Sequence, residues 1–70
     1  MNDLRKPQIK IYETIKHFIQ EKGYPPTVRE IGEKVGLKSS STVYVHLGKL
    51  REKGYLNWEE SQSRTMRILK

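Results

Sequence analysis

Both ends of a very short helix are marked in the middle of the sequence. Thr27-Val28-Arg29-Glu30 has the pattern of a capping box, in which the Thr27 hydroxyl accepts from the Glu30 backbone N–H and the Glu30 carboxylate accepts from the Thr27 N–H. Gly36 is suited to ending the helix, because glycine adopts the left-handed cap conformation without a Cβ penalty. A helix of about two turns is too short to be stable alone. The segment must therefore pack against neighbouring helices.

A second helix is predicted directly after it, because Leu37 and Lys38 leave room only for a tight connection and Ser39 is a favourable N-cap residue. Gly54 is expected to close this helix. Its inward stripe has the spacing i, i+4 and i+7 and consists of Val43, Leu47 and Leu50. The opposite side carries Ser41, Thr42, Tyr44, Val45, Gly48 and Lys49. These six residues are therefore expected to lie on the side of the helix that faces solvent.

The N-terminal part of the chain predicts a longer helix from about Pro7 to Lys22, followed by an extended connection at Pro25 and Pro26. Its apolar stripe comprises Ile9, Tyr12, Ile15, Phe18 and Ile19. After Gly54 the periodicity changes, and residues 55–59 and 65–69 predict two short strands joined by a polar loop. The alternating residues Leu56, Trp58, Met66 and Ile68 are expected to form the buried face of this hairpin.

Three helices followed by a hairpin is the order of a winged helix-turn-helix, so the predicted fold class is α+β, mainly α. Seventy residues fit a single domain spanning residues 1–70. The absence of cysteine excludes disulfides, thiolate zinc sites and cysteine nucleophiles. Apolar runs are too short for a signal peptide or a membrane span, so no membrane partner and a cytoplasmic location are expected.

The charge balance favours a polyanionic partner. Fourteen Lys and Arg against eight Asp and Glu give a net charge of +6 and a pI near 9.8. Part of the surplus lies on and beside the helix predicted to begin at Ser39, where a single acid, Glu52, accompanies Lys38, Lys49, Arg51 and Lys53. Charge alone is weak evidence, but a short helix, a glycine-containing turn and a helix with a small, hydroxyl-bearing start form the arrangement that places a helix in the DNA major groove.

Individual residues leave alternatives open. Of the basic residues Lys49, Arg51 and Lys53, some are expected to contact phosphate and the others only to keep the protein soluble. Arg64 is either a phosphate contact or a solvated loop arginine. His46 is expected to be packed, and Trp58 is expected in the core rather than stacked on a base. The sequence shows no nucleophile with its base and no metal-ligand spacing, so neither enzymatic activity nor a cofactor or metal is expected.

Several segments together resemble a known family. They are Gly23-Tyr24-Pro25-Pro26-Thr27-Val28-Arg29-Glu30-Ile31-Gly32, Val35-Gly36-Leu37, Ser39-Ser40-Ser41-Thr42-Val43, His46-Leu47, and Leu50 through Lys53-Gly54. This pattern resembles the N-terminal DNA-binding domain of the LexA family of bacterial SOS repressors and covers nearly all seventy residues. The serine-rich segment is more similar to the Gram-positive form than to the enterobacterial one.

The resemblance implies a repressor that binds palindromic operators of double-stranded DNA as a dimer. The base-reading positions of the family correspond to Ser39, Ser41, Thr42, Tyr44 and Val45. Backbone contacts are expected from Lys38, Ser40, Lys49, Lys53 and Arg64. A full LexA also carries a self-cleaving dimerisation domain, whereas this chain ends at Lys70, as either a fragment or a natural short relative.

Self-cleavage is therefore not transferred to this chain, which is expected to be a monomer alone and a dimer on DNA only if it is linked to a dimerisation domain. Two other functions remain open at this point. A winged-helix protein-interaction module would use Tyr44 and Val45 to meet a protein partner. A double-stranded RNA binder would prefer an A-form duplex.

Overall fold

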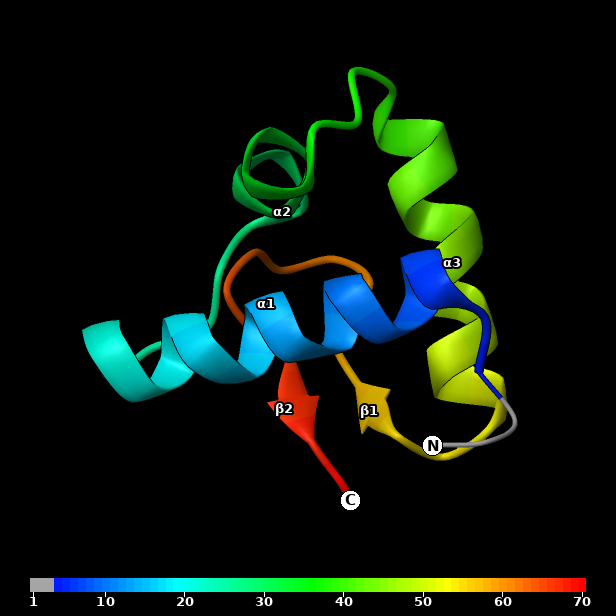
Figure 1. Cartoon of the computed structure of the whole chain (residues 1–70). Helices are drawn as coiled ribbons and strands as arrows, with labels where there is room; N and C mark the ends of the chain where they lie inside the picture. Colours follow the sequence, from blue (N-terminus) through cyan, green and yellow to red (C-terminus); the bar gives the residue numbers. More distant parts are fainter. Residues whose placement is uncertain (1–3) are drawn as a thin grey trace.

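The computed structural model describes residues 4–70, which form three helices followed by a two-stranded antiparallel ribbon (Figure 1). In chain order the elements are α1 (Lys6–Lys22), α2 (Val28–Val35), α3 (Ser40–Glu52), β1 (Leu56–Asn57) and β2 (Arg67–Ile68). Leu56 lies opposite Ile68, and Asn57 lies opposite Arg67. The order of elements confirms the winged helix-turn-helix that the sequence predicts.

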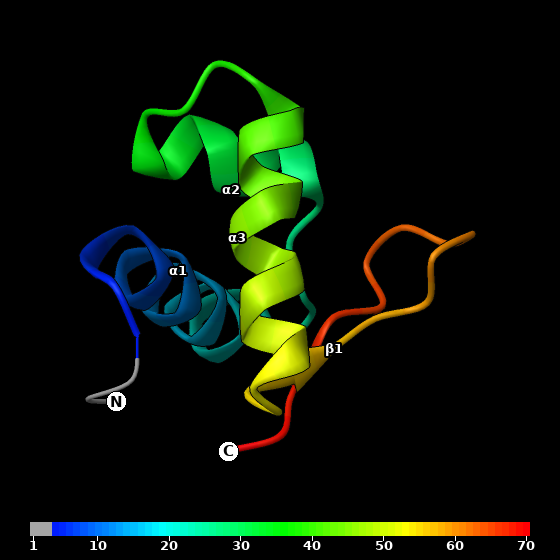
Figure 2. The ribbon, with the colours of Figure 1, turned by 90° about the vertical axis from the view of Figure 1, so that its right-hand side faces the viewer.

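The strands are shorter than the five residues predicted for each, because side chains take over the hydrogen bonds that a longer ladder would use. Asn57 Oδ1 accepts from the Trp58 backbone N–H at 2.9 Å, and Thr65 Oγ1 accepts from the Glu59 N–H at 2.8 Å. Backbone groups satisfied in this way do not need a strand partner. Residues 58–66 therefore form a loop, called the wing here, which projects on the side of α3 away from α1 (Figure 2).

Helix α1 buries a wider face than the predicted stripe. Ile15 is fully buried and Tyr12 and Phe18 nearly so, as expected. Ile11, which the predicted stripe omits, is only 1% exposed, whereas Ile9 and Ile19 are half-buried at the margin. Ile9 and Ile19 still pack against the core, as the stripe predicts. The stripe omits Ile11 because α1 packs against both α2 and α3, so the buried face of α1 spans more of the helix circumference than one narrow stripe.

The capping box at the start of α2 is confirmed in both directions. The Glu30 backbone N–H donates to Thr27 Oγ1 at 3.1 Å, and the Thr27 N–H donates to Glu30 Oε1 at 2.8 Å. At the other end Gly36 adopts the left-handed conformation with φ of 78°. Ile31 is fully buried as predicted, but Val28 and Val35 are only half-buried. A two-turn helix packed on α1 and α3 has too narrow an interface to cover its flanking valines.

Helix α3 contributes the centre of the core. Val43, Leu47 and Leu50 are fully buried, which confirms the predicted inward stripe. The hairpin adds Leu56, Trp58 and Met66 to the same cluster, while Ile68 is half-buried against it. Because Val43, Leu47 and Leu50 bury one face of α3, its opposite face points outward.

None of the helices in residues 4–70 is long and apolar enough to cross a membrane.

The turn between α2 and α3 depends on a close approach at Gly32. A Cβ atom at this position would lie 3.0 Å from the Leu37 carbonyl oxygen and 3.5 Å from Val43 Cγ2. We expect Gly32→Val to lower the free energy of unfolding by about 1–3 kcal/mol, the usual cost of overpacking. Urea denaturation followed by circular dichroism measures it. Gly48→Val is the control, since a Cβ at Gly48 meets nothing within 4 Å; equal losses would show that the turn tolerates the side chain.

Candidate nucleic-acid interface

The outer face of α3 carries all the residues predicted to read bases. Ser39, Ser41 and Thr42 are exposed at the start of the helix, in the positions opposite the buried stripe. One turn further, Tyr44 is 48% exposed and Val45 is 62% exposed. The predicted exposure of this face is therefore confirmed. Tyr44 and Val45 are thus two of the large hydrophobic side chains that residues 4–70 leave exposed.

The N-terminus of α3 is open to solvent. Ser39 occupies the N-cap position with extended backbone angles, as predicted, but its side chain makes no capping hydrogen bond. The first turn contains no acidic residue. The backbone N–H groups of this turn and the positive end of the helix dipole therefore face outward without a side-chain cap, a geometry that suits an anion such as phosphate.

The residues predicted to contact the DNA backbone are all exposed, but they differ in their partners. Within residues 4–70, Lys38 and Lys49 form no ion pair. Lys53 lies just past the end of α3, where its carbonyl oxygen accepts a hydrogen bond from Lys70 Nζ at 3.3 Å. Ser40 is the first residue of α3. These four residues flank the hydroxyl-bearing turn and the far end of the same helix.

Arg51 holds the outgoing limb of the wing, a role that the sequence analysis missed. Its Nε donates to Asn57 Oδ1 at 2.8 Å, and its Nη2 donates to the Trp58 carbonyl at 2.6 Å. Its Nη1 donates to Glu60 Oε1 at 2.6 Å, and the guanidinium lies 3.6 Å from the Trp58 ring centroid. Planar stacking together with a fork of donors is characteristic of arginine. Trp58 is buried beneath it, which confirms the prediction that Trp58 belongs to the core.

Arg64 lies on the returning limb of the wing, where its guanidinium is bound to the start of α2. Its Nη1 and Nη2 donate to the two carboxylate oxygens of Glu30 at 2.9 and 3.1 Å. Nη1 also lies 3.2 Å from the Pro25 carbonyl oxygen, and the guanidinium faces the Tyr24 ring. The hydrogen bond from Arg64 lowers the pKa of Glu30 and in turn raises the pKa of Arg64.

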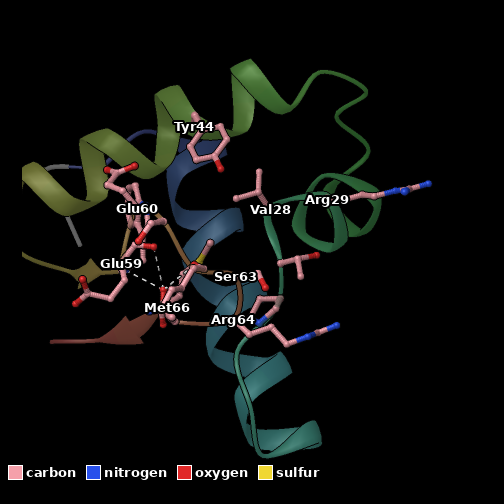
Figure 3. Close-up of a pocket in the computed structure, with 14 residues that line it drawn as sticks. Val28, Arg29, Tyr44, Glu59, Glu60, Ser63, Arg64 and Met66 are labelled. Atoms are coloured by element: carbon pink, nitrogen blue, oxygen red, sulfur yellow. Dashed lines mark hydrogen bonds between the residues drawn. The ribbon is translucent and has the colours of Figure 1, made fainter.

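A groove of about 310 Å³ separates the wing from α2 and α3. Tyr44 reaches into it from α3 and Val28 from α2, while Glu59 and Glu60 line it from the wing (Figure 3). In the same view Arg29 extends away from the groove. The outer face of α3 therefore continues into a walled channel whose far side is the wing.

The histidines provide no alternative site. His46 is half-buried on α3, and its Nδ1 is buried without a hydrogen-bond partner in the described structure, in keeping with the packed histidine predicted from the sequence. His17 lies 3.3 Å from Glu21 on the exposed face of α1. In residues 4–70 no three His, Cys, Asp or Glu side chains are grouped to hold a metal ion.

The Glu30 pairing predicts a pH dependence of stability. A carboxyl group whose pKa is lower in the folded state stabilises the fold above its unfolded pKa, and the contribution is lost as pH falls through the folded value. We expect Glu30→Gln, which keeps the capping box, to lower Tm at neutral pH and to converge with the unmodified protein as the pH falls through the lowered folded-state pKa of Glu30. Glu33→Gln changes the charge equally at an exposed position. A constant Tm difference across this range would contradict the assignment.

Comparisons with known proteins show similarity to one family along the chain. The family model described as the LexA DNA binding domain matches residues 1–65. A LexA repressor of Staphylococcus haemolyticus is 55% identical over 69 residues, which are 99% of this chain and 33% of the relative. LexA repressors of Staphylococcus epidermidis and Staphylococcus aureus are each 54% identical over 99% of this chain, and the aligned residues are 34% and 33% of those proteins.

The chain thus spans about a third of the length of the curated relatives it matches. The match lies in the DNA-binding part of that family, and the similarity to staphylococcal proteins confirms the resemblance to the Gram-positive type. Because the family model covers α1, α2, α3 and most of the wing, the similarity extends over the helices and the groove together. This chain belongs to the LexA DNA-binding domain family.

Proposed function

We propose that the chain binds double-stranded DNA sequence-specifically, as the operator-binding domain of a transcriptional repressor, with α3 in the major groove. The observation that carries this proposal is the position of the predicted base-reading residues, which all lie on the outer face of α3. They are Ser39, Ser41, Thr42, Tyr44 and Val45. Small hydroxyl-bearing residues at the helix start permit close approach to the duplex and can bond to base edges, while apolar groups can meet thymine methyls.

Backbone contacts are assigned to residues on either side of the reading face. Lys38 and Ser40 lie at the open N-terminus of α3, and Lys49 and Lys53 lie in and just after its last turn. Each lysine that neutralises a phosphate releases counterions and steepens the salt dependence of binding. Arg64 is also predicted as a phosphate contact, but its guanidinium is bound to Glu30 in the free protein and would have to be shared.

One copy of the chain presents one reading helix, so we propose a monomer that binds an operator half-site weakly. Tight binding to a palindromic operator requires two linked copies, since linkage raises the effective local concentration of the second without new contacts. A repressor acting on bacterial DNA works in the cytoplasm, and that location forms part of the proposal.

The proposal is tested by selecting duplexes from random DNA and titrating the best one beside its scrambled form at several salt concentrations. We expect at least about tenfold weaker binding to the scrambled duplex. The slope of log K against log salt should be about −3 if Lys38, Lys49 and Lys53 each neutralise one phosphate. Equal affinity for both duplexes would contradict sequence-specific recognition, and preference for an A-form RNA duplex of the same sequence would indicate an RNA binder.

A second candidate function rests on the exposure of Tyr44 and Val45. Exposed aromatic and apolar side chains on one face are typical of protein interfaces, so a winged-helix protein-interaction module would use the same surface. This alternative predicts that no duplex is retained in the selection and that Ser41→Arg has no effect on DNA binding. The open N-terminus of α3 and its flanking lysines favour DNA.

A further inference from the structure

The wing is tied to the helices at two separate points. Arg51 of α3 binds Trp58 and Glu60 on the outgoing limb, and Asn57 of β1 just before it. Arg64 on the returning limb binds Glu30 of α2. The two limbs are also joined to each other, because Thr65 Oγ1 accepts from the Glu59 N–H. The outgoing limb is thus fixed relative to the reading helix, and the returning limb is fixed relative to the helix before it.

Glu30 has two functions in this arrangement. Its Oε1 accepts from the Thr27 N–H at 2.8 Å and from Arg64 Nη1 at 2.9 Å, and its Oε2 accepts from Arg64 Nη2 at 3.1 Å. The carboxylate that starts α2 therefore also holds the wing. Because a forked guanidinium on a carboxylate constrains orientation as well as distance, this pair fixes the direction in which the returning limb leaves the helices.

The backbone conformation of Arg64 is one that a non-glycine residue seldom adopts without support from surrounding contacts. Arg64 is the one non-glycine residue with positive φ among residues 4–70, at 56°. Residues other than glycine adopt positive φ at a cost in conformational energy, and such residues persist where surrounding contacts hold them. The contacts of Arg64 with Glu30, the Pro25 carbonyl and the Tyr24 ring are the ones that meet this condition.

We infer that Arg64 and Glu30 position the wing across the groove from Tyr44, and that Arg64 serves DNA binding through this pairing rather than by neutralising a phosphate. The inference rests on the proposed function. Arg64 and Tyr44 line the same groove, and Arg64 lies where the loop returns toward β2. Loss of either partner releases one side of that groove while Arg51 still holds the other.

A double-mutant cycle separates the two roles of Arg64. Arg64→Asn keeps a residue that tolerates positive φ but is too short to reach Glu30, and Glu30→Gln keeps the capping box while removing the charge. We expect each change to weaken binding to the selected duplex by about three- to tenfold. The double variant should be no weaker than the weaker single variant, because both changes remove the same interaction. The salt slope should stay unchanged.

Direct phosphate contact by Arg64 predicts two different results, and either of them overturns the inference. In that case Arg64→Asn weakens binding and makes the salt slope shallower by about one, while Glu30→Gln leaves the affinity equal or higher. Arg64→Lys provides a second test, which separates the charge of Arg64 from its forked geometry. A lysine keeps the charge without the fork, so positioning predicts a loss close to that of Arg64→Asn, whereas phosphate neutralisation predicts nearly full affinity. Arg67→Asn, at an exposed residue of β2, controls for the loss of one positive charge.

A measurement on the free protein distinguishes failure of this inference from failure of the proposed function. Backbone ¹⁵N order parameters of residues 59–65 should fall in both Arg64→Asn and Glu30→Gln, while those of α2 stay unchanged in Glu30→Gln. If the unmodified protein binds no duplex specifically, the proposed function is wrong, whatever these values are. If it does bind, and the wing keeps its order in both variants, Arg64 and Glu30 do not position the wing.

Discussion

Replacing Thr42 with glutamate is expected to weaken binding to the selected duplex by about a hundred- to a thousandfold. The side chain is exposed in the first turn of α3. A carboxylate there would face the negative surface of DNA at close range, and apposed like charges cost several kcal/mol, with about 1.4 kcal/mol for each factor of ten. Fluorescence anisotropy titration at fixed salt measures the loss.

The fold should survive this change, which separates binding from stability. A glutamate in the first turn interacts favourably with the positive end of the helix dipole, so Tm should not fall. Gln20→Glu introduces the same charge on the exposed surface of α1 and serves as the control. A Thr42→Glu variant that binds within about threefold of the Gln20→Glu variant would remove the outer face of α3 from the interface.

Leu47→Ala is expected to abolish cooperative folding at 37 °C. Leu47 is fully buried in α3 at the centre of the core cluster. Truncating a buried leucine costs about 2–5 kcal/mol through lost burial and the cavity left behind. A domain of this size without disulfides or a metal has a stability of only a few kcal/mol, so the cost is comparable to the whole.

Urea denaturation at low temperature, followed by circular dichroism, gives the change in unfolding free energy. Val45→Ala is the matched control on the same helix, because Val45 is 62% exposed and its loss should change stability by no more than about 0.5 kcal/mol. DNA binding, measured on folded protein, should show the opposite order. Val45→Ala should weaken binding more than Leu47→Ala does. A Leu47→Ala variant within about 1 kcal/mol of the unmodified protein would contradict the buried stripe.

The helices could be predicted because their signals are local. The Thr27–Glu30 box and Gly36 define α2 within ten residues, and the spacing of Val43, Leu47 and Leu50 identifies the buried side of α3. From that stripe the exposure of Tyr44 and Val45 follows directly, since residues on the other side of a helix face away. The assignment of those residues to base reading came from the family resemblance and not from periodicity.

The ties of the wing could not be predicted, because they join residues far apart in the sequence. Arg64 and Glu30 are 34 residues apart, and no local pattern pairs a loop arginine with a helix-start glutamate. Arg51 reaches Asn57 of β1 and two wing residues, Trp58 and Glu60, only because the chain turns back after Gly54. The same contacts explain the short strands, since the side chains of Asn57 and Thr65 take backbone hydrogen bonds that a strand pattern assigns to a ladder.

Mapping DNA contacts by nuclear magnetic resonance tests the central claim most directly. Titration of ¹⁵N-labelled protein with the selected duplex is predicted to shift amide signals most strongly in residues 39–45, with a second group in the wing and little change along the exposed side of α1. The largest shifts on α1, or no shifts beyond those caused by the scrambled duplex, would contradict a reading face on α3.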